Sequence, residues 1–130
     1  MKMPPDITAT RKLLITLIYQ ISSAEFQENA WVKKISGPFL DFGELMCHFF
    51  DDLNIPKIVE MRNEYGFSEE EARGIQSLYK KLDAYCEAVP DDVESEAVYI
   101  DSRWKDIRKF ASNVYKTLKV GRHENPLTSG

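Results

Sequence analysis

The chain has 130 residues, which is long enough for one domain with a sizeable apolar core. Its formal net charge is −4 at pH 7. Its 43% hydrophobic and 29% charged residues exclude a globally disordered chain, and no apolar run approaches the roughly 20 residues that cross a bilayer. The two cysteines, Cys47 and Cys86, fall on predicted helices, which favours free thiols in a cytoplasmic protein. Asp6 and several polar residues within the apolar run 13–21 oppose a secretory signal.

The first predicted helix runs from about Asp6 to Ile21. Its β-branched residues would also suit a buried strand, but its length and the lack of a pairing partner favour a helix. The apolar face is broad, which indicates a central helix. Its members are Leu13, Leu14, Ile15, Leu17, Ile18 and Ile21.

A second helix is predicted from near Ser23 to a point before Gly37-Pro38. Ser22 and Glu25 have the spacing of a capping box, in which each side chain binds a free backbone N–H at the helix start. The Gly-Pro pair is a typical helix stop. Apolar residues are spread around this segment, so its packing face is not predicted.

The segment Asp41–Leu53 has the clearest helical pattern. Asp41 and Glu44 again have capping-box spacing. The apolar residues recur at i, i+3, i+4, i+7, i+8 and i+11, which places them on one face of an α-helix. They are Phe42, Leu45, Met46, Phe49, Phe50 and Leu53.

Further helices follow in the second half of the chain. A short one begins near Pro56 and runs to Tyr65, where Gly66 ends it. Another begins at a Ser68–Glu71 capping box and ends at Pro90. Its predicted apolar side carries Ala72, Ile75, Leu78, Tyr79, Leu82, Cys86 and Val89.

The last predicted helix runs from about Ser102 to Val120 and closes at Gly121. Its apolar side carries Trp104, Ile107, Ala111, Val114, Tyr115 and Leu118. The pattern as a whole predicts an all-α, single-domain, irregular bundle of five or six amphipathic helices over residues 1–122. Residues 123–130 form a predicted polar tail.

The opposite face of the segment Asp41–Leu53 carries the one tight grouping of a histidine with carboxylates. Glu44, His48 and Asp51 project in similar directions on an α-helix, so a divalent metal or acid–base chemistry is a hypothesis for them. A di-metal helical bundle needs a Glu-x-x-His pair from each of two helices, and here the residue three after Glu44 is Cys47 rather than histidine. Capping by Glu44 and a solvated His48 explain the same residues, and no cofactor is predicted.

Cys47 and Glu69–Glu71 receive structural interpretations. Adjacent residues on a helix point about 100° apart, so Cys47 and His48 are poorly placed to act as nucleophile and base. Cys47 and Cys86 are instead interpreted as buried structural thiols. The run Glu69–Glu71 is typical of an acidic first turn, because the following turn offers Arg73 and Gly74 rather than further carboxylates.

Charge is unevenly distributed along the chain. Residues 87–101 contain six acidic residues and no basic one, whereas residues 102–122 contain seven basic residues and one acidic residue. Lys105, Lys109 and Lys116 share one flank of the last helix, where nucleic-acid phosphates would be met. The net charge of −4 and the lack of aromatic residues on that flank oppose nucleic-acid binding.

The acidic residues predict a surface that captures a basic protein. The residues assigned to it are Asp51, Asp52, Asp91, Asp92, Glu94 and Glu96, with Tyr99 as an apolar anchor. The functional hypothesis is a small protein-binding module, of the immunity or antitoxin kind, that neutralises a basic toxin or nuclease stoichiometrically. The alternative is a helical-bundle enzyme or ligand-binding protein that uses His48 and nearby carboxylates, with or without a divalent metal. The acidic stretch before the last helix is interpreted as a loop, and its simple solvation explains the same charges. A homodimer also stays open.

Overall fold

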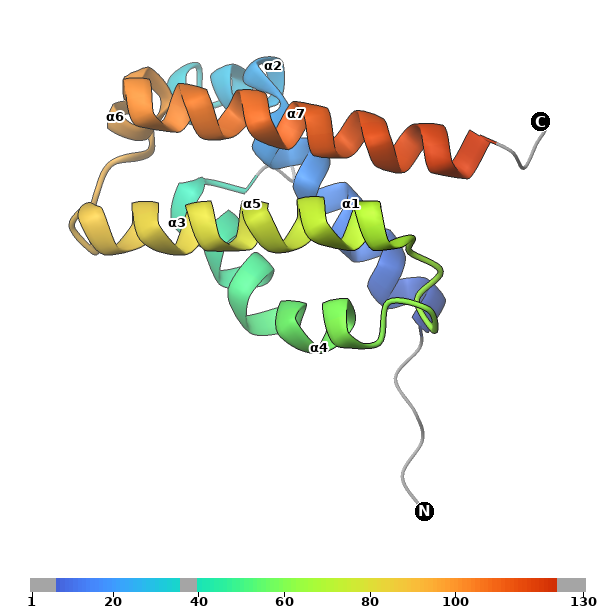
Figure 1. The fold of residues 1–130 in the computed structure, drawn as a ribbon. Coiled ribbons are helices and arrows are strands. Elements are labelled where there is room, and N and C mark those ends of the chain that lie inside the picture. The colour runs from blue at the N-terminus through green and yellow to red at the C-terminus, as the bar shows by residue number, and fades with distance from the viewer. Residues whose placement is uncertain (1–6, 36–39, 124–130) are drawn as a thin grey trace.

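The computed structural model describes residues 7–35 and 40–123 of the chain (Figure 1). The described residues form helices and turns and contain no strand, so the predicted all-α bundle is confirmed. None of the described helices combines the length and the apolar composition that a membrane span requires.

Helix α1 (Ile7–Ser22) lies at the centre of the bundle. It buries Leu14, Leu17, Ile18 and Ile21, as the broad apolar face predicted. In Figure 1 it crosses behind the antiparallel pair of helices α5 (Glu69–Ala88) and α7 (Ser102–His123). Helix α1 makes its most extensive contacts with α7, so a helix near the start of the chain packs on one near its end.

The second predicted helix is shorter and starts with a different cap. Helix α2 (Ala24–Gln27) is capped by Ser23, whose hydroxyl accepts a hydrogen bond from the N–H of Phe26 at 3.0 Å. The hydroxyl of Ser22 instead donates to the carbonyl of Tyr19 in the preceding helix at 2.7 Å, so the predicted Ser22–Glu25 box is wrong by one residue. The π-helical turn η1 (Glu28–Val32) follows directly.

The helical segment made of α2 and η1 ends at Val32, several residues before the predicted stop. Lys34 has a φ of 54°, in the left-handed region that ends helices. The predicted Gly37-Pro38 stop lies outside the described residues.

The segment with the clearest pattern forms helix α3 (Phe42–Cys47) followed by the π-helical turn η2 (His48–Asp52). The Asp41–Glu44 capping box is confirmed in both directions, at 2.8 and 3.0 Å. The predicted apolar face is buried except for Phe50, which is half-buried. The π turn is the departure from the predicted continuous α-helix.

Helix α4 (Ile55–Glu60) is also shorter than predicted. Pro56 lies in its first turn and Asn54 caps it, accepting from the N–H of Lys57 at 3.3 Å. The chain then turns through residues 61–66 rather than continuing as a helix to Tyr65. The guanidinium of Arg11 donates to the carbonyl of Tyr65 and lies 4.3 Å from the centre of the Phe67 ring, so this turn is tied to α1.

The second half of the bundle holds α5, α6 and α7. The Ser68–Glu71 capping box that starts α5 is confirmed, at 2.7 and 3.1 Å. The acidic stretch that was interpreted as a loop contains helix α6 (Ser95–Ile100), which buries Val98 and packs on η1. Helix α7 passes the predicted closing residue Gly121 and continues to His123; residues 124–130 of the predicted tail lie outside the described residues.

A group of aromatic rings fills the end of the bundle near α3 and α6. Phe42 meets Trp31, Tyr85 and Trp104 in edge contacts, with ring centres 5.4 to 6.1 Å apart. The indole N–H of Trp31 donates to the carbonyl of Leu40 at 2.8 Å. This rigid aromatic layer holds the N-terminus of α3 against the C-terminal half of α5, which positions the groove described next.

Candidate functional site

A groove of about 330 Å³ lies between α3–η2 and the C-terminal end of α5. One wall comes from the α3–η2 segment and the other from residues 86–91. The lining residues are Phe42, Gly43, Met46, Cys47, Phe50, Asp51, Cys86, Val89, Pro90 and Asp91. Most are apolar or sulfur-containing, and the two aspartates are the charged ones.

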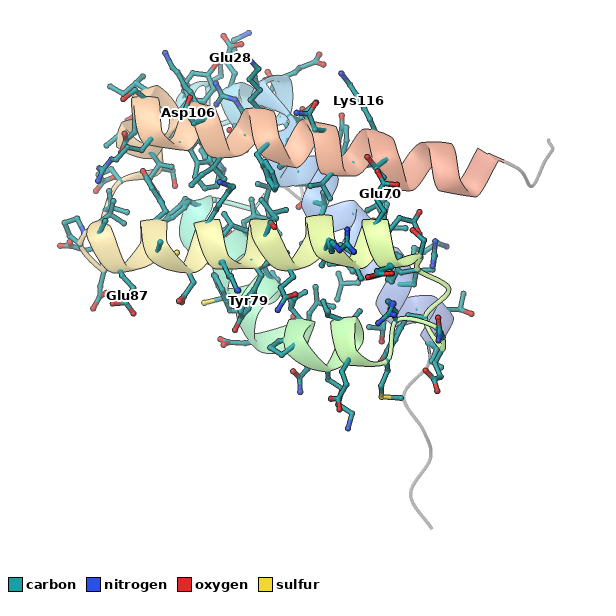
Figure 2. All side chains as sticks on the ribbon, in the orientation of Figure 1. Glu28, Glu70, Tyr79, Glu87, Asp106 and Lys116 are labelled. Carbon is teal, nitrogen blue, oxygen red and sulfur yellow. The ribbon has the colours of Figure 1, made fainter. Side chains whose placement is uncertain are left out.

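Local sequence explains the shape of both walls. Pro90 lacks an N–H and cannot continue a helix, so α5 ends at Ala88 and the chain turns away through Asp91. On the other wall, the π turn adds a residue to the helical turn and changes the direction of the side chains that follow. Phe50 there contacts the ring of Tyr79, with ring centres 5.5 Å apart. Figure 2 shows Tyr79 projecting from α5 on the side of α3 and α4.

Negative charge surrounds the groove. Asp51 and Asp91 lie on opposite walls, and both side chains are exposed. Burial raises the pKa of the Cys86 thiol to about 11, and the negative charges of Asp83 and Glu87 add to this shift. Figure 2 shows Glu87 projecting outward from the last turn of α5. A high pKa leaves Cys86 as an unreactive thiol, which agrees with its structural interpretation. Cys47 is exposed, so its interpretation as a buried thiol is wrong.

Four of the six acidic residues predicted to form one surface line two adjacent cavities. Asp51 and Asp91 line the first groove. Glu94 and Glu96 line a second cavity of about 280 Å³, together with Asp41 at the N-terminus of α3. The N–H of Phe42 donates to Ser95 Oγ at 2.9 Å, so α6 is fixed beside this N-terminus. Phe42 and Gly43 line the first groove, directly after Asp41 in the second cavity, so the two cavities are neighbours.

Three of the predicted surface residues do not line the first groove or the second cavity. Asp92 is exposed and Asp52 is paired with Nδ1 of His48, one turn away on the same segment. Tyr99 lies beneath the guanidinium of Arg108, 5.2 Å from its ring centre, on the side of α6 that faces α7. Tyr99 thus packs within the bundle instead of lining the groove.

Two of the candidate metal ligands, Glu44 and His48, bind neighbours in their own helical segment. Glu44 accepts a hydrogen bond from the Asp41 N–H as part of the cap, and His48 meets Asp52. Among residues 7–35 and 40–123, no three His, Cys, Asp or Glu side chains are grouped so that they would hold a metal ion. The main concave feature beside these residues is the groove between α3–η2 and the end of α5.

Sequence reasoning missed a polar cluster around Tyr85. Its hydroxyl donates to Asp101 at 2.9 Å, and Arg103 binds the two Asp101 oxygens at 3.2 and 2.7 Å. The hydrogen bond from Arg103 lowers the pKa of Asp101 to about 2, while burial raises the pKa of Tyr85. Tyr85 follows Leu78 and Leu82 at i+7 and i+3, so helical spacing was the signal that would have placed it in the core.

Comparisons of the chain with protein-family models, with curated proteins and with solved structures find no match.

Proposed function

We propose that this protein binds a basic protein partner in a one-to-one complex, through the groove between α3–η2 and the end of α5. The observation that carries the proposal is the combination of an apolar floor with a carboxylate on each wall. In its most concrete form the protein is an immunity or antitoxin-like inhibitor. Its carboxylates would then cover the cationic active site of a toxin such as a nuclease.

The chemistry of the groove favours both fast association with a cationic partner and a stable complex. Exposed carboxylates raise the association rate with a cationic surface, and this steering weakens with salt. An apolar floor provides the contact energy that charges alone do not give, because exposed ion pairs contribute about 0–1 kcal/mol each. Asp41, Glu94 and Glu96 line the neighbouring cavity toward α6, where Lys34 lies 3.8 Å from Glu96 and offsets one of the three charges.

The π-helical turn η2 provides independent support. Such turns are rare and are frequently found at functional sites. Here the turn contributes Phe50 and Asp51 to the groove. A strictly α-helical segment would have presented a different set of side chains at this position.

Affinity purification from the native host tests the proposal with two matched charge-reversal variants. The groove variant carries Asp51→Lys and Asp91→Lys; the control carries Glu25→Lys and Glu60→Lys, which change the net charge equally at exposed positions away from the groove. We expect the wild type and the control to recover the same basic protein in equimolar amounts at low salt, with less at high salt. The groove variant should lose it.

Recovery of the same partner by the groove variant would contradict the proposal. So would a partner with an acidic surface, or the recovery of no partner by the wild type. Circular dichroism melting of all three proteins checks that they are equally folded.

A further inference from the structure

Each wall of the groove carries one carboxylate beside an apolar floor. Asp51 is contributed by η2 on one wall, and Asp91 follows the end of α5 on the other. Among the described residues neither carboxylate has an ion-pair partner, and no basic side chain lines the groove. Both carboxylates are thus available to cations that come from outside the molecule.

The size of the groove limits what it accepts. A volume of 330 Å³ is at the lower end of the range for ligand cavities, about 300–1,000 Å³, so it holds one or two side chains rather than a whole helix. Met46, Cys47 and Cys86 supply soft, adaptable sulfur atoms, which make favourable contacts with aromatic rings. The floor therefore suits a single large apolar side chain.

We infer that the groove recognises an exposed segment in which one large apolar or aromatic residue is flanked on both sides by lysine or arginine. The apolar side chain enters between the walls, and the flanking cations meet Asp51 on one side and Asp91 on the other. This inference rests on the proposed function and names the part of the partner that is bound. The charge complementarity extends to Asp83 and Glu87, which lie on α5 near Cys86.

A second copy of this chain is the competing occupant. Lys33, Lys34 and Ile35 form an exposed basic and apolar segment after η1, and Ile35 is 49% exposed. Lys34 already lies 3.8 Å from Glu96 of the same chain, however, and the net charge of −4 opposes self-association. A basic partner satisfies the groove without this repulsion.

Selection of random heptapeptides displayed on phage, against the full chain, tests the inference directly. We expect the enriched peptides to carry a large apolar residue between basic residues. A representative peptide should bind the Cys47→Trp variant at least ~30-fold more weakly, because the indole fills the groove and removes an anchor contact. Cys47 is exposed, so this substitution does not disturb the core.

Chemical labelling of Cys47 blocks the groove without a mutation and provides a second test. A bulky maleimide should react with the exposed Cys47 well before the half-buried Cys86, whose raised pKa leaves little thiolate. The labelled protein should lose the peptide to the same degree as Cys47→Trp. The Glu25→Lys, Glu60→Lys protein should bind the peptide like the wild type.

Three results would overturn the inference: no enrichment, enriched peptides without basic residues, or binding that survives both Cys47 changes. Light scattering that finds a dimer broken by Ile35→Asp would assign the groove to a second copy instead. The proposed function is tested separately, since a basic partner lost only by the Asp51→Lys, Asp91→Lys protein would stand even if the peptide selection failed.

Discussion

Gln27 is a fully buried polar residue whose contacts join three parts of the chain. Its amide donates to the carbonyls of Gln20 and Ile21 at 2.8 Å, and its carbonyl accepts from Trp104 and Arg108 at 3.0 Å. The bonds to the carbonyl of Ile21 and from the indole of Trp104 are buried, and an unsatisfied polar group there costs about 1–3 kcal/mol. The sequence did not predict this role because the hydrogen-bond partners on α7 are 77 and 81 residues away.

The carboxyl group of Asp101 should make the stability of the protein depend on pH. Its pKa is lowered from the ordinary value of 3.8 to about 2, chiefly by the hydrogen bond from Arg103. A carboxyl with a lower pKa in the folded chain stabilises the fold above pH 4, and this contribution disappears as the pH falls toward 2. We expect Asp101→Asn to lower the free energy of unfolding by about 1 kcal/mol at pH 7, since the site is partly open to solvent.

Urea denaturation at pH 7, 4 and 2 measures this difference. The gap between the wild type and Asp101→Asn should be constant from pH 7 to about 4 and should shrink below that. A gap that persists unchanged at pH 2 would show that the Asp101 carboxylate is not the source of the stability.

At the scale of single helices, the capping residues divide into those that sequence predicts and one that it misplaces. Asp41 and Ser68 were predicted because each box is a local pattern with a single candidate cap residue. At the second helix two serines compete for the same role. Ser22 lies at the end of α1, so its hydroxyl is used by the carbonyl of Tyr19 and Ser23 becomes the cap.

A pair of alanine variants tests this assignment. Ser23→Ala should lower the free energy of unfolding by about 1 kcal/mol, the usual effect of losing an N-cap. Ser22→Ala should change it by less than about 0.5 kcal/mol, because its bond is exposed to solvent. Chemical denaturation of both proteins provides the comparison. An Ser22→Ala variant that is the less stable of the two would restore the cap to Ser22.

Alanine substitutions at two glycines, Gly74 and Gly66, should change the stability of the protein in opposite directions. A Cβ at Gly74, in the interior of α5, would lie 3.5 Å from Val114, an ordinary contact, so Gly74→Ala should stabilise the protein by about 0.5–1 kcal/mol. Gly66 has a φ of 78° and a Cβ there would lie 2.9 Å from Arg11 Nη1. Gly66→Ala should therefore destabilise the protein by about 1–2 kcal/mol.

Thermal melting followed by circular dichroism separates these cases, since the two melting temperatures should move in opposite directions from that of the wild type. A lower melting temperature for Gly74→Ala would mean that α5 and α7 approach more closely at Val114 than the structure has them.

The elements that sequence did not predict share a physical cause. The π turns η1 and η2 and the short helix α6 depend on packing rather than on local pattern: α6 is held by η1, by α7 and by the hydrogen bond between Phe42 and Ser95. Their composition alone resembled a continuous helix or an acidic loop. The long helices were predictable because α1, α5 and α7 each bury a periodic apolar face.

At the scale of the whole molecule, the acidic groove and the basic flank occupy different elements. Lys105, Lys109 and Lys116 are exposed on α7, and Figure 2 shows Lys116 pointing away from α5. The groove lies at the other edge of α5, against α3. Sequence reasoning predicted the acidic residues as a set, but only the fold could join Asp51 to Asp91, which are 40 positions apart, and assign Tyr99 to the packing against Arg108.

Hydrogen exchange of the protein with and without its recovered basic partner is the most direct test of this account. Binding at the groove should slow exchange in the segments 42–52 and 86–96 and leave the exposed flank of α7 unchanged. Protection concentrated on α7, or protection that the Asp51→Lys, Asp91→Lys protein retains, would contradict the assignment of the groove as the binding site.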